Sequence, residues 1–428
     1  MPEASDRAAP ARAARTHGEA RPRVLVFAFA CDPHRGSEPG AGAAIAKAAA
    51  LVGDVTVLTR AEPGRDPAVD IPAACGVTRA VAIPSRAWEA RLPVHVRYAA
   101  WCVRAAAWRR AHRTGSDYQV LHHATYASDW FLNPLMLLRK APGEQWVAGP
   151  GGGATYPSVA IARAAAGGGV ATLASELVRR WSTRASRRLM AARLRRRVDH
   201  ALALNPDSRA ELSRLGFPRV SVTSNAVIDY AALPLREDHR PGSAPRVLFM
   251  GRGTRWKGLP LLLRAAAHLP PDTVIDIAGP GTDASAYRDA AAALTHLRTP
   301  VTFHGSLPRD RALALLAATD ALAFGSLHDS APWAAAEAAA LGVPVVCLDL
   351  GGVAMMAGEA ARVVSTADAD SLPRRFAEAL VAAAAEDPSD RPRPTREFTL
   401  GALAETLGAA YMGAPVASPG IVRLRREG

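Results

Sequence analysis

Short apolar runs alternate with alanine- and leucine-rich segments along this 428-residue chain, and the whole pattern occurs twice. The first half opens on Arg23–Ala30 and the second on Arg246–Met250, and a glycine-containing loop and a helix-forming segment follow each run. Continuous apolar runs are typical of strands in parallel sheets, and their alternation with helices is typical of an α/β fold. The sequence therefore predicts two α/β domains, with ligands bound in the cleft outside the carboxyl ends of the strands.

The domain boundaries follow from where this pattern stops. Residues 234–245 have no periodicity and are predicted to link an N-terminal domain, 23–233, to a C-terminal domain, 246–398. A last helix is expected at 399–413 and is a candidate to pack back on the N-terminal domain. The expected strands of the first domain are Arg23–Ala30, Val55–Thr59, Val77–Ile83, Gln119–His123, Trp146–Ala148, Ala201–Leu204 and Val220–Asn225. Those of the second are Arg246–Met250, Thr273–Ala278, Val301–His304, Ala321–Phe324, Val343–Leu348 and Arg362–Val364.

Composition narrows the class of protein. Residues 1–22 and 414–428 are expected to be disordered tails, and the first of them lacks the apolar core of a signal peptide. No run approaches the roughly 18 apolar residues that a membrane-spanning helix needs. The four cysteines lie apart, without the spacing of a zinc site or of a disulfide scaffold. These features predict a cytoplasmic protein.

The formal charge of +13 favours anionic partners, namely nucleotide phosphates, acidic lipids or nucleic acid. The densest basic run, Arg179–Arg197, contains Trp181 and Leu189 and has two interpretations, a solvated helix face or a surface for anionic lipid. A nucleic-acid-binding protein is the alternative from another class and predicts aromatic residues clustered with arginines. Aromatic residues make up only 6% of the chain, so no nucleic-acid partner is expected.

The most informative stretch is Phe324–Val346, which has the pattern of a strand, a loop, a helix and a second strand. Pro332 suits the first turn of the helix and Gly342 suits its end. The backbone amides at Trp333, with Ser330 just before them, offer an anion site at the start of the helix. This stretch predicts a phosphate-binding helix N-terminus.

Two acids accompany this helix. Glu337 lies roughly 7 Å along it, where a carboxylate suits ribose hydroxyls if a phosphate sits on the amides. Asp329 precedes the helix, where it would meet a sugar hydroxyl. The alternative is an ordinary helix with Asp329 or Ser330 as its N-cap and Glu337 exposed. Against it, Glu337 is the only charge within Ala331–Val346, and a lone buried carboxylate needs a partner.

Two loops follow the first strands of the domains. Arg252 and Lys257 belong to the loop after Arg246–Met250 and suit a diphosphate, although a solvated basic loop is the alternative. In the first domain, Gly40 and Gly42 belong to a predicted glycine-rich loop that would let the backbone approach a ligand across the cleft. That loop lacks the spacing of a dinucleotide-binding motif.

Together these segments resemble the retaining glycosyltransferases of family 4, which have the GT-B fold of two Rossmann-like domains. The family carries G-R-x(4)-K-G and an acid followed, after seven residues, by Glu and A-x(3)-G-x-P-V-V. The matching residues are Gly251, Arg252, Lys257, Gly258, Asp329, Glu337, Ala338, Gly342, Pro344, Val345 and Val346. Gly351-Gly352 matches as well, and Gly36–Gly42 and Trp146–Gly153 resemble a subgroup of the family. The similarity spans roughly residues 23–410.

The resemblance implies roles for these residues. Glu337 would hold the donor ribose, while Arg252 and Lys257 would hold the diphosphate. Asp329 stands where the family usually has Glu, so it reaches about one methylene less toward the sugar. Family members also have a strand-end histidine facing the reaction centre, and strand alternation allows only one of His122 and His123 to do so.

The predicted reaction moves a sugar from a UDP- or GDP-linked donor to an acceptor hydroxyl with retention, without a metal or other cofactor. A growing cell-surface polysaccharide or a lipid-linked glycan is the expected acceptor, bound by the N-terminal domain, and a small natural product is the alternative. An epimerase or a phosphorylase is the rival of the same fold. Asp368-Ala-Asp370 resembles a metal-binding D-x-D but precedes a helix start, far from the predicted site. The inner face of the cell membrane is a candidate location.

Overall fold

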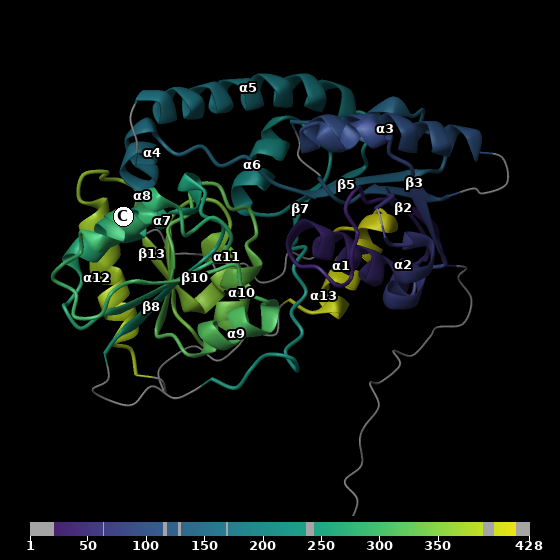
Figure 1. Cartoon of the computed structure of the whole chain (residues 1–428). Coiled ribbons are helices and arrows are strands. Elements are labelled where there is room, and N and C mark those ends of the chain that lie inside the picture. The colour runs from purple at the N-terminus through teal and green to yellow at the C-terminus, as the bar shows by residue number, and fades with distance from the viewer. Residues whose placement is uncertain are drawn as a thin grey trace, which may run out of the picture.

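The computed structural model describes residues 21–62, 64–113, 118–126, 130–167, 170–236, 244–387 and 398–416. Most of the two predicted tails, 1–20 and 417–428, and linker residues 237–243 lie outside the described residues. The described part contains two parallel sheets, each with helices on both faces (Figure 1). This arrangement confirms the predicted α/β class with two Rossmann-like domains.

The sheet of the N-terminal domain has the order β3-β2-β1-β4-β5-β6-β7 in the described chain, and every neighbouring pair is parallel. Its strands are β1 (Arg23–Phe27), β2 (Asp54–Arg60), β3 (Arg79–Ile83), β4 (Val120–His123), β5 (Gln145–Gly151), β6 (His200–Ala203) and β7 (Val220–Val222). All seven predicted strands are present, with ends shifted by a few residues. Its main helices are α1 (Ser37–Val52), α2 (Pro67–Cys75), α3 (Val94–Ala111), α5 (Val170–Leu194) and α6 (Pro206–Arg214).

The sheet of the C-terminal domain has the order β10-β9-β8-β11-β12-β13 and is also parallel. Its strands are β8 (Arg246–Met250), β9 (Val274–Ala278), β10 (Thr302–Gly305), β11 (Ala321–Phe324), β12 (Val345–Leu348) and β13 (Ala361–Val364). Its helices are α7 (Leu259–Ala265), α8 (Ser285–Ala292), α9 (Arg309–Ala317), α10 (Trp333–Ala340), α11 (Val353–Ala357) and α12 (Leu372–Ala384). The central strands β8, β11 and β12 are almost wholly apolar because helices cover both of their faces.

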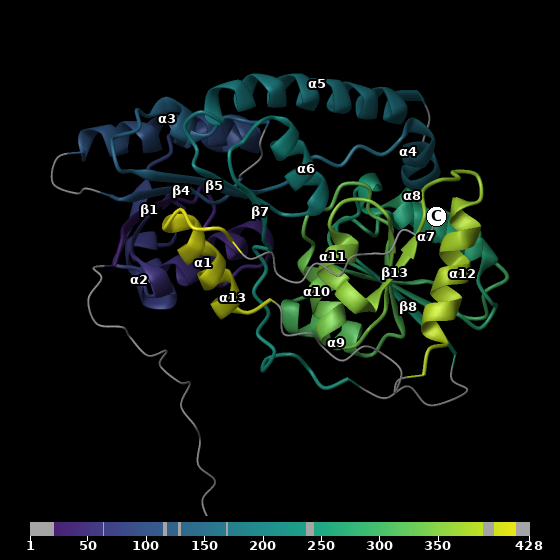
Figure 2. The ribbon, with the colours of Figure 1, turned by 180° about the vertical axis from the view of Figure 1, so that it is seen from behind.

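Two helices pack on the domain to which they do not belong in sequence. Helix α13 (Leu400–Tyr411) lies against α1, and its Leu403 and Leu407 are buried in the core of the N-terminal domain (Figure 2). In return, Ile161 of α4 (Val159–Ala166) is buried in the core around α7. The predicted N-terminal range 23–233 therefore includes a helix that completes the other domain, and the exchange holds the two domains together.

The predicted glycine-rich loop after β1 is shorter than expected, because α1 already begins at Ser37 with Gly36 as its N-cap. Gly40 and Gly42 are consequently helical and buried rather than part of a loop. A side chain is excluded at Gly42, since its Cβ would lie 2.0 Å from the carbonyl oxygen of Ala30. The glycines thus let the start of α1 pack directly against the end of β1.

Candidate active site

The loops after β8 and β11 are joined by backbone contacts at the carboxyl edge of the second sheet. The amide of Leu327 donates to the carbonyl of Trp256 at 2.9 Å. Gly258 has φ +92°, and a Cβ there would lie 2.4 Å from the backbone of Gly325, so this position requires glycine. This close approach brings the end of the basic loop next to the acidic loop.

Lys257 and Asp329 form an ion pair at this junction, with Nζ 2.6 Å from Oδ1. Their side chains are only 16% and 12% exposed. The other carboxylate oxygen of Asp329, Oδ2, is buried and has no hydrogen-bond partner within the described residues. A buried carboxylate oxygen without a donor is costly, and a hydroxyl group would satisfy it. The pair thus joins one residue predicted to bind diphosphate to the one predicted to contact the sugar.

Ser330 is bound by two residues of the N-terminal domain. Its hydroxyl accepts a hydrogen bond from the amide of Gly153 at 3.1 Å, and its carbonyl accepts one from Asn205 Nδ2 at 3.0 Å. The amide of Gly352 donates to the carbonyl of Asp329 at 2.9 Å. A Cβ at Gly352 would lie 1.8 Å from the Ser330 oxygen, so the Gly-Gly segment is required for this approach. The loop that carries Asp329 is therefore fixed from two sides.

Glu337 lies in α10 and is 4% exposed. The partner that a buried carboxylate needs is Arg309 at the start of α9, whose Nη2 lies 2.5 Å from Oε1. Arg309 is itself 53% exposed. Arg309 was not predicted from the sequence, because nothing in its local pattern distinguishes it from the other surface arginines.

The remaining predicted residues have different surroundings. The start of α10 meets α1 across the domains, since a Cβ at Gly40 would lie 3.4 Å from the ring of Trp333. Arg252 is exposed, and its guanidinium lies 6.0 Å from the ring of Trp256. It makes no hydrogen bond or ion pair with any residue that the structure describes. Gly42, in contrast, packs inside the N-terminal domain. The structure therefore joins Lys257 to the loop that carries Asp329 and places Trp333 against α1 at Gly40. The roles of these residues in donor binding stay predictions.

A strained tyrosine that was not predicted from the sequence lies just beyond the carboxyl end of β4, in the first sheet. Tyr126, just after β4, has a positive φ of 53°, and its amide donates to Glu38 Oε1 at 2.5 Å. Burial raises the pKa of Glu38, against the effect of this hydrogen bond. Burial and Glu38 raise the pKa of Tyr126, whereas the positive charges of Arg60, Arg97 and Arg252 oppose the rise. Backbone strain of this kind is concentrated at functional sites. The one sequence signal was Glu38, the lone acid in the glycine-rich segment.

The two candidate histidines at the end of β4 are both buried, at 0% and 1% exposed. Nε2 of His122 lies 2.7 Å from the Gly149 carbonyl and Nδ1 lies 2.8 Å from the Tyr411 hydroxyl in α13. The carbonyl only accepts, so Nε2 donates to it, and the neutral ring accepts from Tyr411 through Nδ1. His123 faces the other side of the sheet, with Nε2 2.9 Å from the hydroxyl of Tyr98. Each histidine therefore faces a different helix layer, and neither has an exposed ring.

Acidification is expected to destabilise the fold between about pH 6.5 and about pH 4. Burial lowers the pKa of His122 to about 4, and burial together with the neighbouring His122 lowers the pKa of His123 to about 3. In the unfolded chain both histidines titrate near pH 6.5, so the unfolded state binds more protons than the folded state in this range. The free energy of unfolding therefore decreases as the pH is lowered. At about 1.4 kcal/mol per pH unit, each histidine costs up to roughly 3 kcal/mol.

Urea unfolding of the parent and of His122→Gln at about pH 7 and about pH 5 measures this effect. The variant is expected to start less stable, because it loses the contacts to Tyr411 and Gly149, but to lose less stability on acidification. If the free energy of unfolding decreases equally for the two proteins between these pH values, His122 does not contribute to the acid sensitivity.

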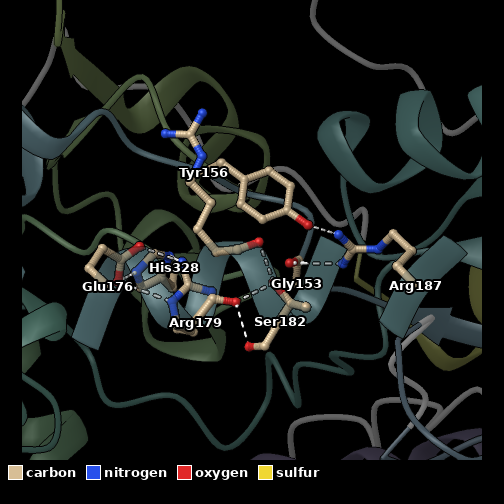
Figure 3. Close-up of polar contacts among 9 residues, drawn as sticks. Gly153, Tyr156, Glu176, Arg179, Ser182, Arg187 and His328 are labelled. Carbon is tan, nitrogen blue, oxygen red and sulfur yellow. Dashed lines mark hydrogen bonds and ion pairs between the residues drawn. The ribbon is translucent and has the colours of Figure 1, made fainter. Parts of the chain in front are cut away.

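The basic run is partly structural rather than a solvated face. In α5, Arg187 is fully buried and donates to the Gly153 carbonyl at 3.0 Å and to the Tyr156 hydroxyl (Figure 3). Arg179 pairs with Glu176 at 2.6 Å, and both contact His328 in the loop before Asp329 (Figure 3). Burial acts against the charge of Glu176, but the hydrogen bonds from His328 and Arg179 outweigh it and hold its pKa at about 2. Helix α5 therefore braces the loop that carries Asp329.

Comparison with known proteins finds a family model that matches the second domain. Residues 235–389 match the family described as Glycosyl transferases group 1. The D-inositol 3-phosphate glycosyltransferase of Xylanimonas cellulosilytica is 33% identical over 116 residues, which is 26% of this chain and 28% of the relative. The chain thus matches less than a third of that protein's length. All of the predicted donor residues of the second domain lie within the family match.

Two solved structures are similar over nearly the whole chain. Sucrose-phosphate synthase from Thermosynechococcus elongatus superposes with a TM-score of 0.62 at 18% identity, covering 92% of this chain and 98% of that one. Anabaena Alr3699/HepE in complex with UDP and glucose gives a TM-score of 0.56 at 15% identity, covering 92% and 96%. At this identity the likeness shows the fold alone, which is the GT-B fold with its two Rossmann-like domains.

Proposed function

We propose that this protein is a retaining glycosyltransferase of family 4 that transfers a sugar from a nucleoside diphosphate sugar to an acceptor hydroxyl. The observation that carries the proposal is the Lys257–Asp329 pair, at the carboxyl edge of a domain that matches glycosyl transferases group 1. Arg252 lies in the same loop as Lys257 and has no charged partner in the described chain. Helix α10 begins just after the loop that carries Asp329. This is a cationic edge suited to a diphosphate, beside a carboxylate suited to a sugar.

The roles follow from this arrangement. Arg252, Lys257 and the α10 amides stabilise the negative charge of the leaving diphosphate, since donors fixed in place need no reorganisation during the reaction. Glu337 binds the ribose hydroxyls, and Asp329 Oδ2 accepts from a hydroxyl of the transferred sugar. UDP in the similar structure of Alr3699/HepE supports a UDP-linked donor as the first to test, with a GDP-linked donor second.

The proposed reaction needs no metal, because fixed cations supply the charge that a metal would supply. No group of three or more possible metal ligands occurs in the described ranges. Asp368 of the D-x-D segment accepts hydrogen bonds from Asp370 and Ser371 just before α12. We expect UDP release from UDP-glucose, and the rise in melting temperature with UDP, to survive EDTA. Loss of both after chelation, restored by manganese or magnesium, would overturn the metal-free mechanism. No response to UDP, GDP or ADP would overturn the donor site.

We further propose that the acceptor is a cell-surface or lipid-linked glycan, with a small natural product as the alternative. The outer face of α5 supports a membrane-surface acceptor. Val178, Trp181 and Leu189 are exposed at 68%, 76% and 54%, at helical spacing that puts them on one face. Arginines flank this face, and α3 lies along the same side of the molecule (Figures 1 and 2). An apolar stripe with basic flanks is typical of helices that lie on anionic membranes. In the described residues, no helix has the length and apolarity to cross a bilayer.

The protein is expected to bind vesicles of phosphatidylcholine and phosphatidylglycerol weakly, and less as salt rises. Each basic residue near an anionic surface adds about 1 kcal/mol, and the buried apolar stripe adds to it. Trp181→Ser/Leu189→Ser should reduce sedimentation with the vesicles, whereas Val69→Ser, an equally exposed apolar residue of α2, should not. Equal sedimentation with vesicles lacking phosphatidylglycerol would contradict the proposal.

A further inference from the structure

A cavity of about 640 Å³ lies beside the candidate active site and is not used by the donor-site assignment. It is formed by the segment after β5, by α5 and α6, and by the loop after β12 of the other domain. Its charged lining residues are Arg184, Arg188, Arg214, Asp207, Glu211 and Asp349. Both domains therefore contribute to its walls.

The cavity adjoins the loop that carries Asp329. Ala154 of its wall directly follows Gly153, whose amide binds the hydroxyl of Ser330, and Thr155 and Tyr156 of the wall come next. On the opposite side, Leu350 directly precedes the Gly-Gly segment, whose amide binds the Asp329 carbonyl. The two sides touch, since a Cβ at Gly351 would lie 3.4 Å from the hydroxyl of Thr155. A molecule in the cavity would therefore lie next to the predicted position of the transferred sugar.

The charges in the cavity differ in how they are used. Arg214 is paired with Glu211 at 2.6 Å, and Thr155 donates to Asp207 at 3.3 Å. Arg184 lies 4.4 Å above the ring of Tyr156 and makes no hydrogen bond or ion pair with the residues that the structure describes. Arg188 makes no hydrogen bond or ion pair there. The cavity thus offers two guanidinium groups as donors.

The same cavity also presents acceptors. Three carboxylates line it, so a phosphate or sulfate, which only accepts hydrogen bonds at its charged oxygens, would face repulsion as well as attraction. A sugar hydroxyl both donates and accepts, so it can bind a guanidinium and a carboxylate at once. Ala154, Ala210 and Leu350 add apolar surface suited to the C–H face of a pyranose ring. Balanced charge with apolar patches favours a neutral, hydroxyl-rich ligand.

We propose that this cavity binds a neutral saccharide unit of the acceptor, held by Arg184, Arg188 and the carboxylates of Asp207 and Asp349. The proposal rests on the proposed glycosyltransferase function. The proposal specifies the chemical group of the acceptor that the cavity binds, which is a hydroxyl-rich pyranose rather than a phosphate. It also specifies where this group binds. Tyr156, held by buried Arg187, fixes one wall (Figure 3).

The test is saturation-transfer NMR on the full chain, with glucose, galactose and mannose as probes. Excess UDP is present to occupy the donor site. At least one hexose is expected to give a signal with the parent protein. Arg188→Gln and Arg188→Gln/Asp207→Asn should weaken that hexose roughly tenfold or more, the effect of losing hydrogen bonds to charged groups. The single variant removes no hydrogen bond or ion pair of the described chain. Arg209→Gln, an exposed arginine of α6 outside the cavity, should bind like the parent.

Three results would overturn the proposal. The first is that no hexose gives a signal, and the second is that the cavity variants leave the signal unchanged. The third is that millimolar inorganic phosphate displaces the hexose, which would indicate an anion site. The melting temperature with UDP is measured on the same samples. Binding of a hexose in the cavity without binding of UDP would refute the donor site but not the saccharide site. Binding of UDP without binding of any hexose would refute the saccharide site but not the donor site.

Discussion

Asp329→Asn is expected to lower turnover by about 10- to 150-fold while leaving the affinity for UDP nearly unchanged. The buried Oδ2 of Asp329 has no donor in the described chain, and Lys257 together with the amide of Gly352 fixes the residue in place. A hydrogen bond from a carboxylate to the transferred sugar strengthens as charge develops on that sugar, so its loss raises the barrier rather than weakening the ground state. The expected size corresponds to the roughly 1.5–3 kcal/mol of a charged hydrogen bond.

Lys257→Ala should behave differently, with a loss in both UDP affinity and turnover. It removes a diphosphate contact and leaves Asp329 as a charge without its partner, which is destabilising in a partly buried site. Calorimetry with UDP and initial rates with the full donor separate the two variants. Asp199→Asn is the matched control, because it breaks another Lys–Asp pair, with Lys140, outside this site. If Asp329→Asn is folded and turns over like the parent, Asp329 has no contact with the sugar.

The sequence was enough to predict the two sheets and the site edge. Apolar runs are long enough to identify the strands, and parallel strands place their following loops at one edge, so the loops that carry Lys257 and Asp329 were expected at the same edge. Their ion pair was not predicted. A return of the last helix, α13, to the N-terminal domain was among the predictions, whereas the packing of α4 on the C-terminal domain was harder to foresee. The helical pattern of 159–166 shows an apolar face, but a pattern does not say which core that face covers. Only the arrangement of the two folded domains determines that Ile161 is buried beside α7.

Residues that reach the site from distant segments left no local signal. Arg309 resembles any surface arginine until α9 places it beside Glu337. Asn205 is the N-cap of α6, a role that its sequence position alone explains, yet its amide also holds the Ser330 carbonyl. Adjacent His122 and His123 were ambiguous for a physical reason: alternation puts them on opposite faces, and both faces of β4 are covered by helices.

Glu337→Gln is expected to weaken UDP and the full donor alike, by about 1.5–3 kcal/mol or roughly 10- to 150-fold. The carboxylate is 4% exposed, so water replaces a lost ribose contact poorly. Because UDP alone contains the ribose, the loss should appear in its binding constant and equally in the Michaelis constant of the donor. This pattern distinguishes Glu337 from Asp329, whose loss is expected in turnover.

Arg309→Ala separates ribose binding from the ion pair. Because the Glu337 side chain is only 6% exposed, the loss of its partner should lower the melting temperature. Arg309 itself is half exposed, so its loss should change UDP affinity by less than about fivefold, the factor that corresponds to about 1 kcal/mol. Glu378→Gln in α12 is the matched control, since it removes the charge of an equally close Glu–Arg pair at the surface. Calorimetry with UDP on the three variants and the parent, each checked by its melting curve, gives the answer. If folded Glu337→Gln binds UDP as the parent does, or if Arg309→Ala loses as much affinity as Glu337→Gln, the carboxylate serves the packing of α9 on α10 and the ribose lies elsewhere.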